Sequence, residues 1–346
     1  MAAGDNYSPY VLIGKLSRDF LLTEEGEAIN NIPGGHLLYT AIGMTPWERH
    51  PGLISRIGKN FPEQFISLLK KYEFSTEGIK VIPQDIEHRN FISFFDASRD
   101  SDDSKRASVN VLSQYFKAGK PFPRELLGYS SLDNKSDNLN ERTSETILAR
   151  DIPEEFREAR CIHLCPMDYL SHNLIPQVFL GSEKRTITIH SGKGYMQPSY
   201  FNAVKTLING LNGFIVRERN LRNLFKEKYK ISNLSDMMKV LLDYGAENII
   251  VKAENRSYFF INRVDRSIKH LAPVITDKNE KIGELSCFCG AFLAGLNETY
   301  DYLKAVSYGA ARVTLLRDDV NPYNNLEVFS ALVMEKARIM ENNIEG

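Results

Sequence analysis

The stretch EKIGELSCFCGAFLAGL (residues 280–296) carries the strongest fold signal in this chain. Its second half is a run of small and apolar residues that predicts a tightly packed helix, and Gly283 predicts a tight turn just before it. A glycine turn that leads into a helix can hold a phosphate group through its backbone N–H groups. Here Glu284, Leu285 and Ser286 follow the glycine, so side chains fill a place where a phosphate cradle needs open backbone.

Outside this stretch, short apolar runs alternate with amphipathic segments along most of the chain. The runs that predict buried strands are YVLIGKL (10–16), GLISRIG (52–58), GIKVIP (78–83), CIHLCP (161–166), RTITIH (185–190), GFIVRE (213–218) and ENIIVKA (247–253). The segments that predict helices are FPEQFISLLKKYEF (61–74), PSYFNAVKTLINGL (198–211) and LSDMMKVLLDYG (234–245). This alternation predicts an α/β fold with a mainly parallel sheet and helices on both faces.

Three stretches interrupt the alternation. ASRDSDDSKRAS (97–108) and SSLDNKSDNLNERTSE (130–145) are polar and predict exposed loops. NFISFFD (90–96) is rich in aromatic residues and predicts a strand of a small separate sheet that covers the main one. No internal repeat or dividing linker is evident, so we expect a single domain over residues 1–346.

Composition and charge exclude several classes of function. The chain of 346 residues is 42% hydrophobic and 25% charged, which is typical of a globular protein with a sizeable core. A net charge of −1 gives no support to a nucleic-acid or membrane-surface partner. No apolar run approaches the roughly 20 residues that span a bilayer. The N-terminal MAAGDNYSPY lacks the apolar core of a signal peptide, so we expect a cytoplasmic protein.

The four cysteines form two close pairs, Cys161/Cys165 and Cys287/Cys289. Four cysteines in a chain of this length do not indicate a disulfide scaffold. In a strand, Cys161, His163 and Cys165 would share one face because side chains alternate. A zinc site that uses both pairs is an alternative, but neither spacing is the usual C-x2-C. We therefore expect small core residues rather than metal ligands.

Five segments in order resemble the ribokinase-like (PfkB) family of carbohydrate and nucleoside kinases. They are VLIGKLSRD (11–19), IPGGHLLYTAIG (32–43), GLISRIGKNFPEQFISLLKKYEFSTEGI (52–79), SCFCGAFLAGL (286–296) and AVSYGAARVTL (305–315). The resemblance covers most of the chain and rests on the order and spacing of the segments. It implies a ribokinase-like three-layer sandwich with a small β lid, built here from about residues 14–40 and 88–125. It also implies that the lid covers the substrate and is often shared in a homodimer.

The front of the chain keeps the substrate-binding pattern of that family. Asp19 matches the aspartate that accepts hydrogen bonds from sugar hydroxyls, a role that suits a carboxylate at a strand end. Gly34 and Gly35 match the di-glycine hinge, where a missing Cβ lets the lid swing. His36 stands where the family usually has asparagine, which leaves the identity of the sugar open. In an alternative interpretation, Asp19 caps a turn and the glycines belong to a hairpin.

The back of the chain departs from the family at its phosphate-binding turn. The family expects Gly-Ala-Gly-Asp, and this chain has Gly283, Glu284, Leu285 and Ser286 at those positions. The Cβ of Leu285 disfavours left-handed backbone, and the Glu284 carboxylate would repel a phosphate. Ser286 replaces the aspartate that takes the proton from the attacking hydroxyl, and a hydroxyl cannot serve as that base.

Three further elements that serve ATP and magnesium in the family are also altered. The Asn-x-x-Glu stretch reads RERN (217–220), so Asn220 replaces the glutamate. The Thr-x-Gly turn under the nucleotide reads VKAENRS (251–257), with Lys252 and Glu254 in those places. The strand that usually ends in aspartate reads TITIHSGKG (186–194), which offers His190 and Lys193. Several changes at one site predict that ordinary kinase activity is absent or very weak.

Five cationic residues lie at or beside predicted strand ends near the expected nucleotide crevice: Lys193, Arg217, Arg219, Lys252 and Arg256. If they converge, with Gly283, the site would bind an anion such as a nucleotide or a sugar phosphate without magnesium. The alternative is that they are solvated surface charges compensated by Glu218 and Glu254.

Three hypotheses follow for the function. The first is a degenerate kinase homologue, a pseudokinase that binds a small polyol, nucleoside or phosphorylated ligand and signals by lid closure. The second is an active kinase that uses ATP and Mg²⁺ with a shifted base such as Glu284 or Asp277. The third is a structural subunit that dimerises through its lid. None of the three requires a tightly bound metal, a nucleic acid or a membrane.

Overall fold

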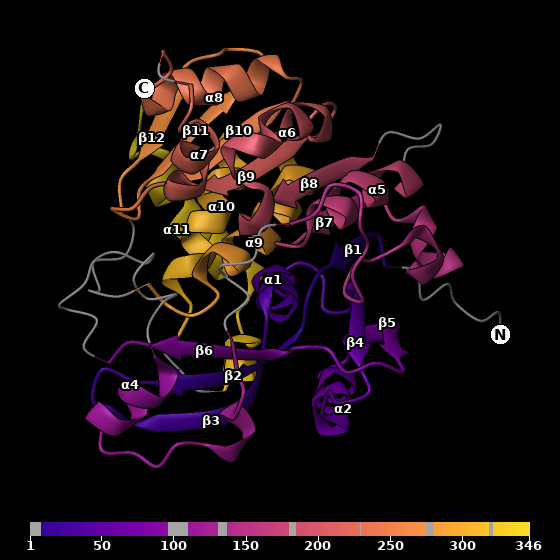
Figure 1. The fold of residues 1–346 in the computed structure, drawn as a ribbon. Helices are drawn as coiled ribbons and strands as arrows, with labels where there is room; N and C mark the ends of the chain where they lie inside the picture. Colours follow the sequence, from indigo (N-terminus) through magenta and orange to yellow (C-terminus); the bar gives the residue numbers. More distant parts are fainter. Residues whose placement is uncertain are drawn as a thin grey trace.

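A ten-stranded sheet crosses the middle of the molecule (Figure 1). It belongs to a computed structural model that describes residues 8–95, 110–130, 137–179, 185–228, 230–273, 280–317 and 321–346. The strand order is β13 (Ile344–Glu345), β12 (Ile268–Leu271), β11 (Tyr258–Asn262), β10 (Asn248–Lys252), β9 (Gly213–Arg217), β8 (Thr186–His190), β7 (Cys161–Leu164), β1 (Tyr10–Ile13), β4 (Gly52–Gly58) and β5 (Ser75–Ile82). The seven strands β10, β9, β8, β7, β1, β4 and β5 pair in parallel, and β11, β12 and β13 add antiparallel strands at one edge.

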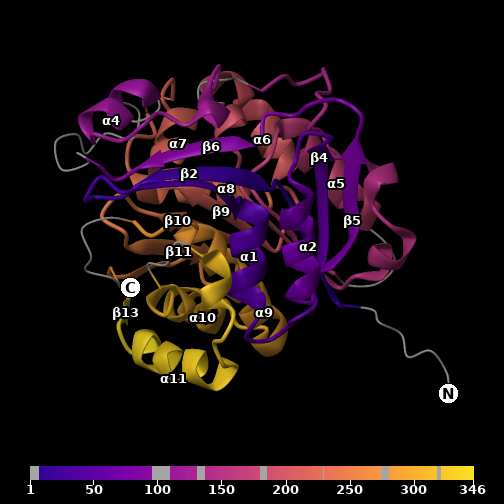
Figure 2. The ribbon, with the colours of Figure 1, turned by 90° about the horizontal axis from the view of Figure 1, so that it is seen from below.

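Helices cover both faces of this sheet, so the predicted three layers and mainly parallel sheet are confirmed (Figure 2). On one side lie α1 (His36–Met44), α2 (Glu63–Lys71), α9 (Glu284–Thr299), α10 (Tyr302–Thr314) and α11 (Ser330–Glu341). On the other lie α5 (Tyr169–Phe179), α6 (Phe201–Leu207), α7 (Glu218–Leu224) and α8 (Leu234–Asp243). Among the described helices, none has the length and apolar character needed to span a bilayer.

Each central strand sends alternate side chains into two separate cores. In β7, Ile162 packs into the core that contains Ile175 of α5, whereas Cys161 packs into the core that contains Leu37 of α1. All four cysteines are buried and free, which confirms their interpretation as small core residues. Because both faces of the strands are covered, their sequences are continuous apolar runs rather than alternating ones.

Helix α9 is the helix predicted from the glycine turn, and it packs closely against α1. A Cβ on Gly290 would lie 2.0 Å from the backbone oxygen of Thr40 in α1. Only glycine therefore allows the two helices to approach this closely. The small residues of α9 position its N-terminus beside the start of α1, where the candidate site lies.

A separate three-stranded sheet lies beside the main body and contains β3 (Ala28–Gly34), β2 (Ser17–Leu22) and β6 (Arg89–Ser93), in that order. Helix α4 (Val111–Lys117) packs on it, because Tyr115 shares a buried cluster with Phe20 and Leu22 of β2. The strand predicted over 90–96 is β6, and its place in a small separate sheet is confirmed. The predicted loop 97–108 and residues 131–136 of the second loop lie outside the described residues.

Candidate functional site

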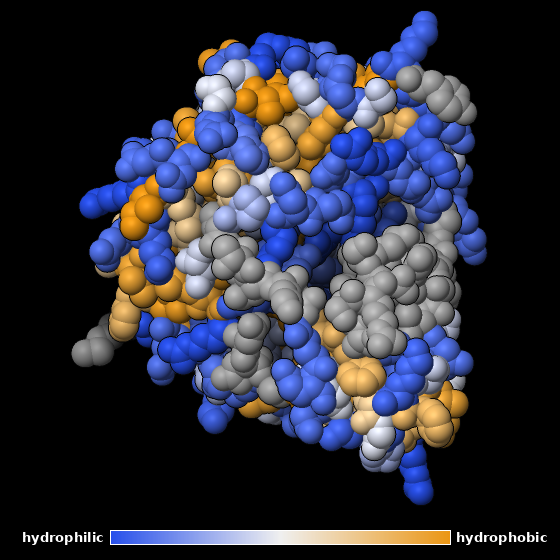
Figure 3. All heavy atoms as spheres, turned by 90° about the vertical axis from the view of Figure 1, so that its left-hand side faces the viewer, coloured by the Kyte–Doolittle hydropathy of each residue, from blue (hydrophilic) through white to orange (hydrophobic). Residues whose placement is uncertain are grey.

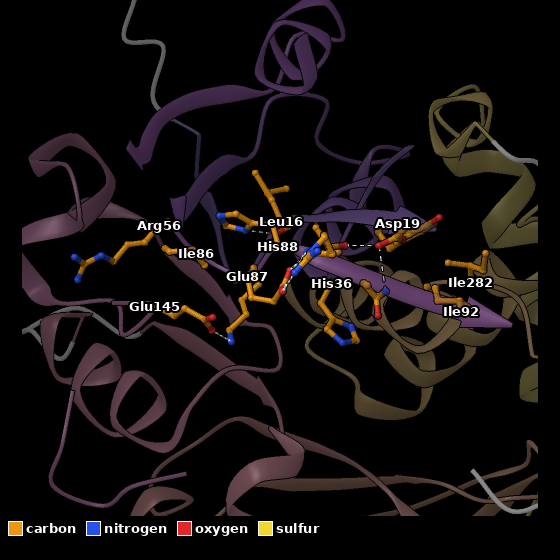
Figure 4. A pocket seen from close by; sticks show the side chains of 18 of the residues that line it. Leu16, Asp19, His36, Arg56, Ile86, Glu87, His88, Ile92, Glu145 and Ile282 are labelled. Carbon is orange, nitrogen blue, oxygen red and sulfur yellow. Dashed lines mark hydrogen bonds and ion pairs between the residues drawn. The ribbon is translucent and has the colours of Figure 1, made fainter. Parts of the chain in front are cut away.

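A pocket of about 230 Å³ opens between the small sheet and the main body (Figure 4). The connection after β1, β2, β6 and the start of α1 supply most of its walls, and β4 and residues 282–283 supply others. Seen from one side, the molecule is hollowed near its middle, and hydrophilic side chains border the hollow (Figure 3).

Asp19 is the most deeply buried carboxylate of the pocket, with 1% of its surface exposed. The hydroxyl of Ser17 donates to Asp19 Oδ1 at 2.5 Å, and the Asn90 amide donates to the same oxygen at 3.1 Å. Burial raises the pKa of Asp19 to about 6, although both hydrogen bonds oppose the rise. The prediction that Asp19 lies at a strand end is wrong, because β1 ends at Ile13 and Asp19 lies within β2.

The two glycines connect β3 to α1 and bring the backbone against Asp19. A Cβ on Gly34 would lie 2.0 Å from Asp19 Oδ2, and Gly35 has a φ of 102°. Any other residue at either position would displace the carboxylate or strain the chain. The alternative that the glycines serve a hairpin holds in part, since Gly34 pairs with Ser17 in the antiparallel β2–β3 hairpin, whereas Gly35 caps α1.

His36 connects the pocket to the first turn of α9. It is the first residue of α1 and lines the pocket, and its Nδ1 lies 2.8 Å from the hydroxyl of Ser286. Its ring also meets the ring of His190 edge-on, with centroids 5.8 Å apart. Burial and the nearby His36 lower the pKa of His190, so this histidine stays neutral. Ser286 is 2% exposed, and its hydroxyl contacts His36, which lines the pocket.

Charged residues that no sequence motif marks form much of the pocket wall. Lys15 forms an ion pair with Glu145, and Arg89 forms one with Glu87. Glu145 belongs to the loop predicted over 130–145, whose described part, 137–145, is mostly exposed. The sequence around Glu145 does not show that this residue reaches the pocket, because its position depends on how residues 137–147 fold over the strand ends.

Gly283 forms the turn before α9 with a φ of 71°, in the left-handed region. A Cβ at this position would lie 2.0 Å from the ring of Tyr39, which packs directly on the turn. The predicted turn is therefore present and requires glycine. Tyr39 and Gly283 both line the pocket, so the ring that packs on the turn is also part of the pocket wall.

The carboxylate of Glu284 occupies the N-terminus of α9. One oxygen accepts from Lys252 Nζ at 2.6 Å, and the other accepts from Arg256 Nη2 at 2.6 Å. The backbone N–H of Lys281 donates to the second oxygen at 3.2 Å. Glu284 is only 2% exposed. The first residue of α9 therefore carries a buried carboxylate that is paired within the chain, at the helix end where the dipole favours negative charge.

Glu280 extends this network to a third cation. Arg217 binds both carboxylate oxygens of Glu280, at 2.7 and 2.8 Å, and Lys252 Nζ binds one of them at 2.7 Å. Burial alone would raise the pKa of Glu280, but Arg217 and Lys252 hold it well below its usual range. We call Arg217, Lys252, Arg256, Glu280 and Glu284 the Glu284 network.

The predicted convergence of cations is therefore partly present. Arg217, Lys252 and Arg256 meet in the network, whereas Lys193 is exposed in a 3₁₀ helix (Lys193–Tyr195) and Arg219 lies in α7. The interpretation that Lys252 is a solvated charge balanced by Glu254 is wrong. Its side chain is 2% exposed and its partners are Glu280 and Glu284. Glu218 pairs with Arg222 instead.

The residues at this end of α9 do not fit Mg²⁺ and ATP. The carboxylates nearest the turn, Glu280 and Glu284, are already bound by cationic side chains, which leaves no free oxygen set for a metal. Among the described residues, no group of three His, Cys, Asp or Glu side chains could hold a metal ion. The backbone N–H of Glu284 donates to the carbonyl of Lys281, so that amide is occupied as well.

No protein-family model and no curated protein matches the sequence. Solved structures share the fold. A ribokinase from Thermotoga maritima is 16% identical with a TM-score of 0.61, and the match covers 96% of this chain and 99% of that one. A fructokinase with bound ATP from Xylella fastidiosa is 10% identical with a TM-score of 0.65, over 96% and 98% of the two chains. A nucleoside kinase from Methanocaldococcus jannaschii is 12% identical with a TM-score of 0.62, over 96% and 99%.

Proposed function

We propose, on the premise that this chain has the fold of ribokinase-like sugar and nucleoside kinases, that it is a catalytically impaired member that binds a small ligand. The ligand would be a polyol, nucleoside or phosphorylated compound held under the small sheet, which would act as a lid. The observation that carries the proposal is the Glu284 carboxylate, bound by Lys252 and Arg256 at the helix terminus that would otherwise receive a phosphate.

Magnitudes support impairment rather than slow but ordinary catalysis. Losing a general base costs about 10²–10⁴-fold in rate. Positioning and electrostatic stabilisation supply most of the acceleration in phosphoryl transfer, so filling the phosphate position removes the larger contribution. Glu284 is also a poor candidate for a shifted base, because both of its oxygens accept from cations. Asp277, the other candidate base, lies outside the described residues.

Ligand binding is supported by the polar groups that the pocket retains. Asp19 accepts from Ser17 and Asn90 on one oxygen, which leaves the other oxygen available to ligand hydroxyls. None of the described cationic side chains forms an ion pair with Asp19, so its charge is balanced by hydrogen bonds alone. A buried carboxylate of this kind is costly to the fold and is explained by binding.

Thermal shift and calorimetry with ribose, fructose, adenosine and ribose 5-phosphate test the proposal. We expect at least one of these probes to stabilise the wild-type protein, and Asp19→Ala to abolish that binding. We expect no ATP consumption with any probe, and none from Ser286→Asp, because Glu284 and its cationic partners are still present at the start of α9. ATP turnover of about 1 s⁻¹ or more on any acceptor would overturn the proposal. Indifference to every small molecule would favour the structural-subunit hypothesis.

A second candidate is weak phosphoryl transfer with His36 as the base. It is favoured by one observation, the contact between His36 Nδ1 and Ser286 Oγ at 2.8 Å beside the pocket. This activity requires Glu284 to leave the helix terminus first. It would therefore be detected as ATP consumption that rises in Glu284→Ala and disappears in the double variant with His36→Ala.

A further inference from the structure

His88 connects the small sheet to the main sheet at the edge of the pocket (Figure 4). It stands directly before β6, and its backbone oxygen accepts from the backbone N–H of Arg18 in β2 at 2.7 Å. Its side chain points toward the main sheet. The backbone N–H of Gly58, at the end of β4, donates to His88 Nε2 at 2.9 Å.

The second ring nitrogen completes the connection. His88 Nδ1 lies 3.2 Å from the backbone oxygen of Leu16, in the segment that leads from β1 to β2. A carbonyl can only accept and a backbone N–H can only donate, so Nδ1 must carry the proton and Nε2 must be bare. This arrangement fixes one neutral tautomer. A protonated ring would turn an N–H toward the N–H of Gly58 and break that bond.

The surroundings of the ring favour the neutral form. His88 is 6% exposed, and the ring of Phe61 meets it edge-on with centroids 4.9 Å apart. Glu87, Glu145 and Lys15 are the charged groups that act on it, and the two carboxylates oppose the lysine. Burial is the largest influence and lowers the pKa of His88. The stability that depends on the neutral ring is thus present at neutral pH and is lost as the pH falls through the folded-state pKa.

We propose that His88 is a positioning residue: through its neutral Nδ1–H tautomer it holds the small sheet, and with it Asp19 and Asn90, in place over the pocket. His88 joins three segments of the pocket wall. Leu16 lines the pocket itself, and Gly58 and Arg18 belong to β4 and β2, which both supply lining residues. This role concerns the free protein and does not depend on which ligand binds. If the role of His88 were disproved, the proposed function would still stand. If the proposed function were disproved, the role of His88 would still stand.

Nitrogen NMR of the full-length protein labelled with ¹⁵N-histidine tests the tautomer directly. We expect the His88 signals, identified by their loss in His88→Gln, to show a protonated Nδ1 and a bare Nε2 at pH 7.5. Free histidine prefers the opposite tautomer, so this result would not arise by default. A protonated Nε2 or a charged ring at pH 7.5 would overturn the proposal.

Amide hydrogen exchange of Gly58, read on a peptide spanning residues 52–60, tests the connection. His88→Phe keeps an aromatic ring against Phe61 but loses both bonds, and we expect about tenfold faster exchange at Gly58. In the wild type, protection should fall with the same midpoint as protonation of His88, after correction for intrinsic exchange. His88→Gln keeps an acceptor near Gly58 and should remove that pH dependence.

His50→Phe is the matched control, because His50 is exposed and bonds the Glu73 backbone oxygen far from the pocket. In His50→Phe, the amide of Gly58 should exchange its hydrogen at the wild-type rate. Wild-type protection in His88→Phe, or protection that persists through protonation of His88, would overturn the proposal.

Discussion

At the scale of single residues, the buried carboxyl of Asp19 lowers the stability of the fold at neutral pH, whereas the proposed function requires it for binding. The pKa of its carboxyl is raised from 3.8 to about 6 by burial, so the folded protein carries an unfavourable charge above pH 6. Because the folded state prefers the protonated form, this cost disappears as the pH falls from about 6 toward 3.8.

Asp19→Asn should therefore stabilise the fold at pH 7.5 while it weakens ligand binding. We expect the free energy of unfolding to rise by roughly 1–3 kcal/mol at pH 7.5 and to match the wild type near pH 3.8. Denaturant titration at the two pH values measures the difference. The control is Asp243→Asn, whose exposed ion pair with Arg266 should contribute little. Equal stability of wild type and Asp19→Asn at pH 7.5 would contradict the reasoning.

At the scale of elements, the turn before α9 depends on Gly283 for two separate reasons. Its φ of 71° disfavours a side chain, and the Tyr39 ring fills the space that a Cβ would need. Gly283→Ala should lower the free energy of unfolding by roughly 2–4 kcal/mol, from strain and displacement of the ring together.

Gly119→Ala separates the two contributions. Gly119 has a similar φ of 66° but nothing within 4 Å of the added Cβ, so this variant reports backbone strain of about 1 kcal/mol alone. Denaturation midpoints of both variants provide the comparison. If the two substitutions cost the same, the packing of Tyr39 on the turn contributes nothing.

The Glu284 network makes a second prediction at this scale. Glu284→Ala leaves the buried Lys252 with one carboxylate and should cost roughly 3–5 kcal/mol. The vacated position should then accept an external anion, so inorganic phosphate should raise the melting temperature of this variant more than that of the wild type. Glu298→Ala, on an exposed turn of the same helix, is the control. A phosphate response equal in all three proteins would show that no anion site was opened.

At the scale of the whole molecule, the expected homodimer can be tested at the small sheet. Leu112 and Phe116 lie one turn apart on α4 and are 56% and 83% exposed, and Leu127 nearby in the chain is 67% exposed. If the chain dimerises through this region, sedimentation should give twice the mass of 39.4 kDa for the wild type and a single mass for Phe116→Asp. Ile339→Asp on α11, also exposed, should not change the mass. A monomeric wild type would remove the dimer from the proposal.

The sequence predicts the main body well because buried parallel strands need unbroken apolar runs. The prediction over 52–58 matches β4 residue for residue. Strand β3 (Ala28–Gly34) was not predicted, because AINNIPG is only partly buried and carries two asparagines and a proline. Strand β2 was not predicted as a separate strand. It pairs with β3, the next strand in the chain, and with β6, more than sixty residues away, and no local pattern records the second pairing.

The candidate site was predicted where the glycine motifs mark it and missed where it depends on tertiary contacts. Asp19 and His36 were selected through neighbouring glycines. Glu280 was not, because its importance arises from Arg217 and Lys252 on two different strands. A signal was nevertheless present, since a lysine that ends an otherwise apolar strand needs a buried partner.

The parallel pairing of β2 with β6 has a consequence for how the protein is made. Arg18 to Leu22 align with Arg89 to Ser93, and β4, α2 and β5 all lie between them in the chain. Until β6 leaves the ribosome, β2 and β3 form only a two-stranded ribbon, which is marginal in water. The small sheet that lines the pocket can therefore be completed only after β1, β4 and β5 have been synthesised, although β7 and the rest of the main sheet follow β6 in the chain. A fragment that stops before β6 would expose Phe20 and Leu22 and would be a ready target for chaperones.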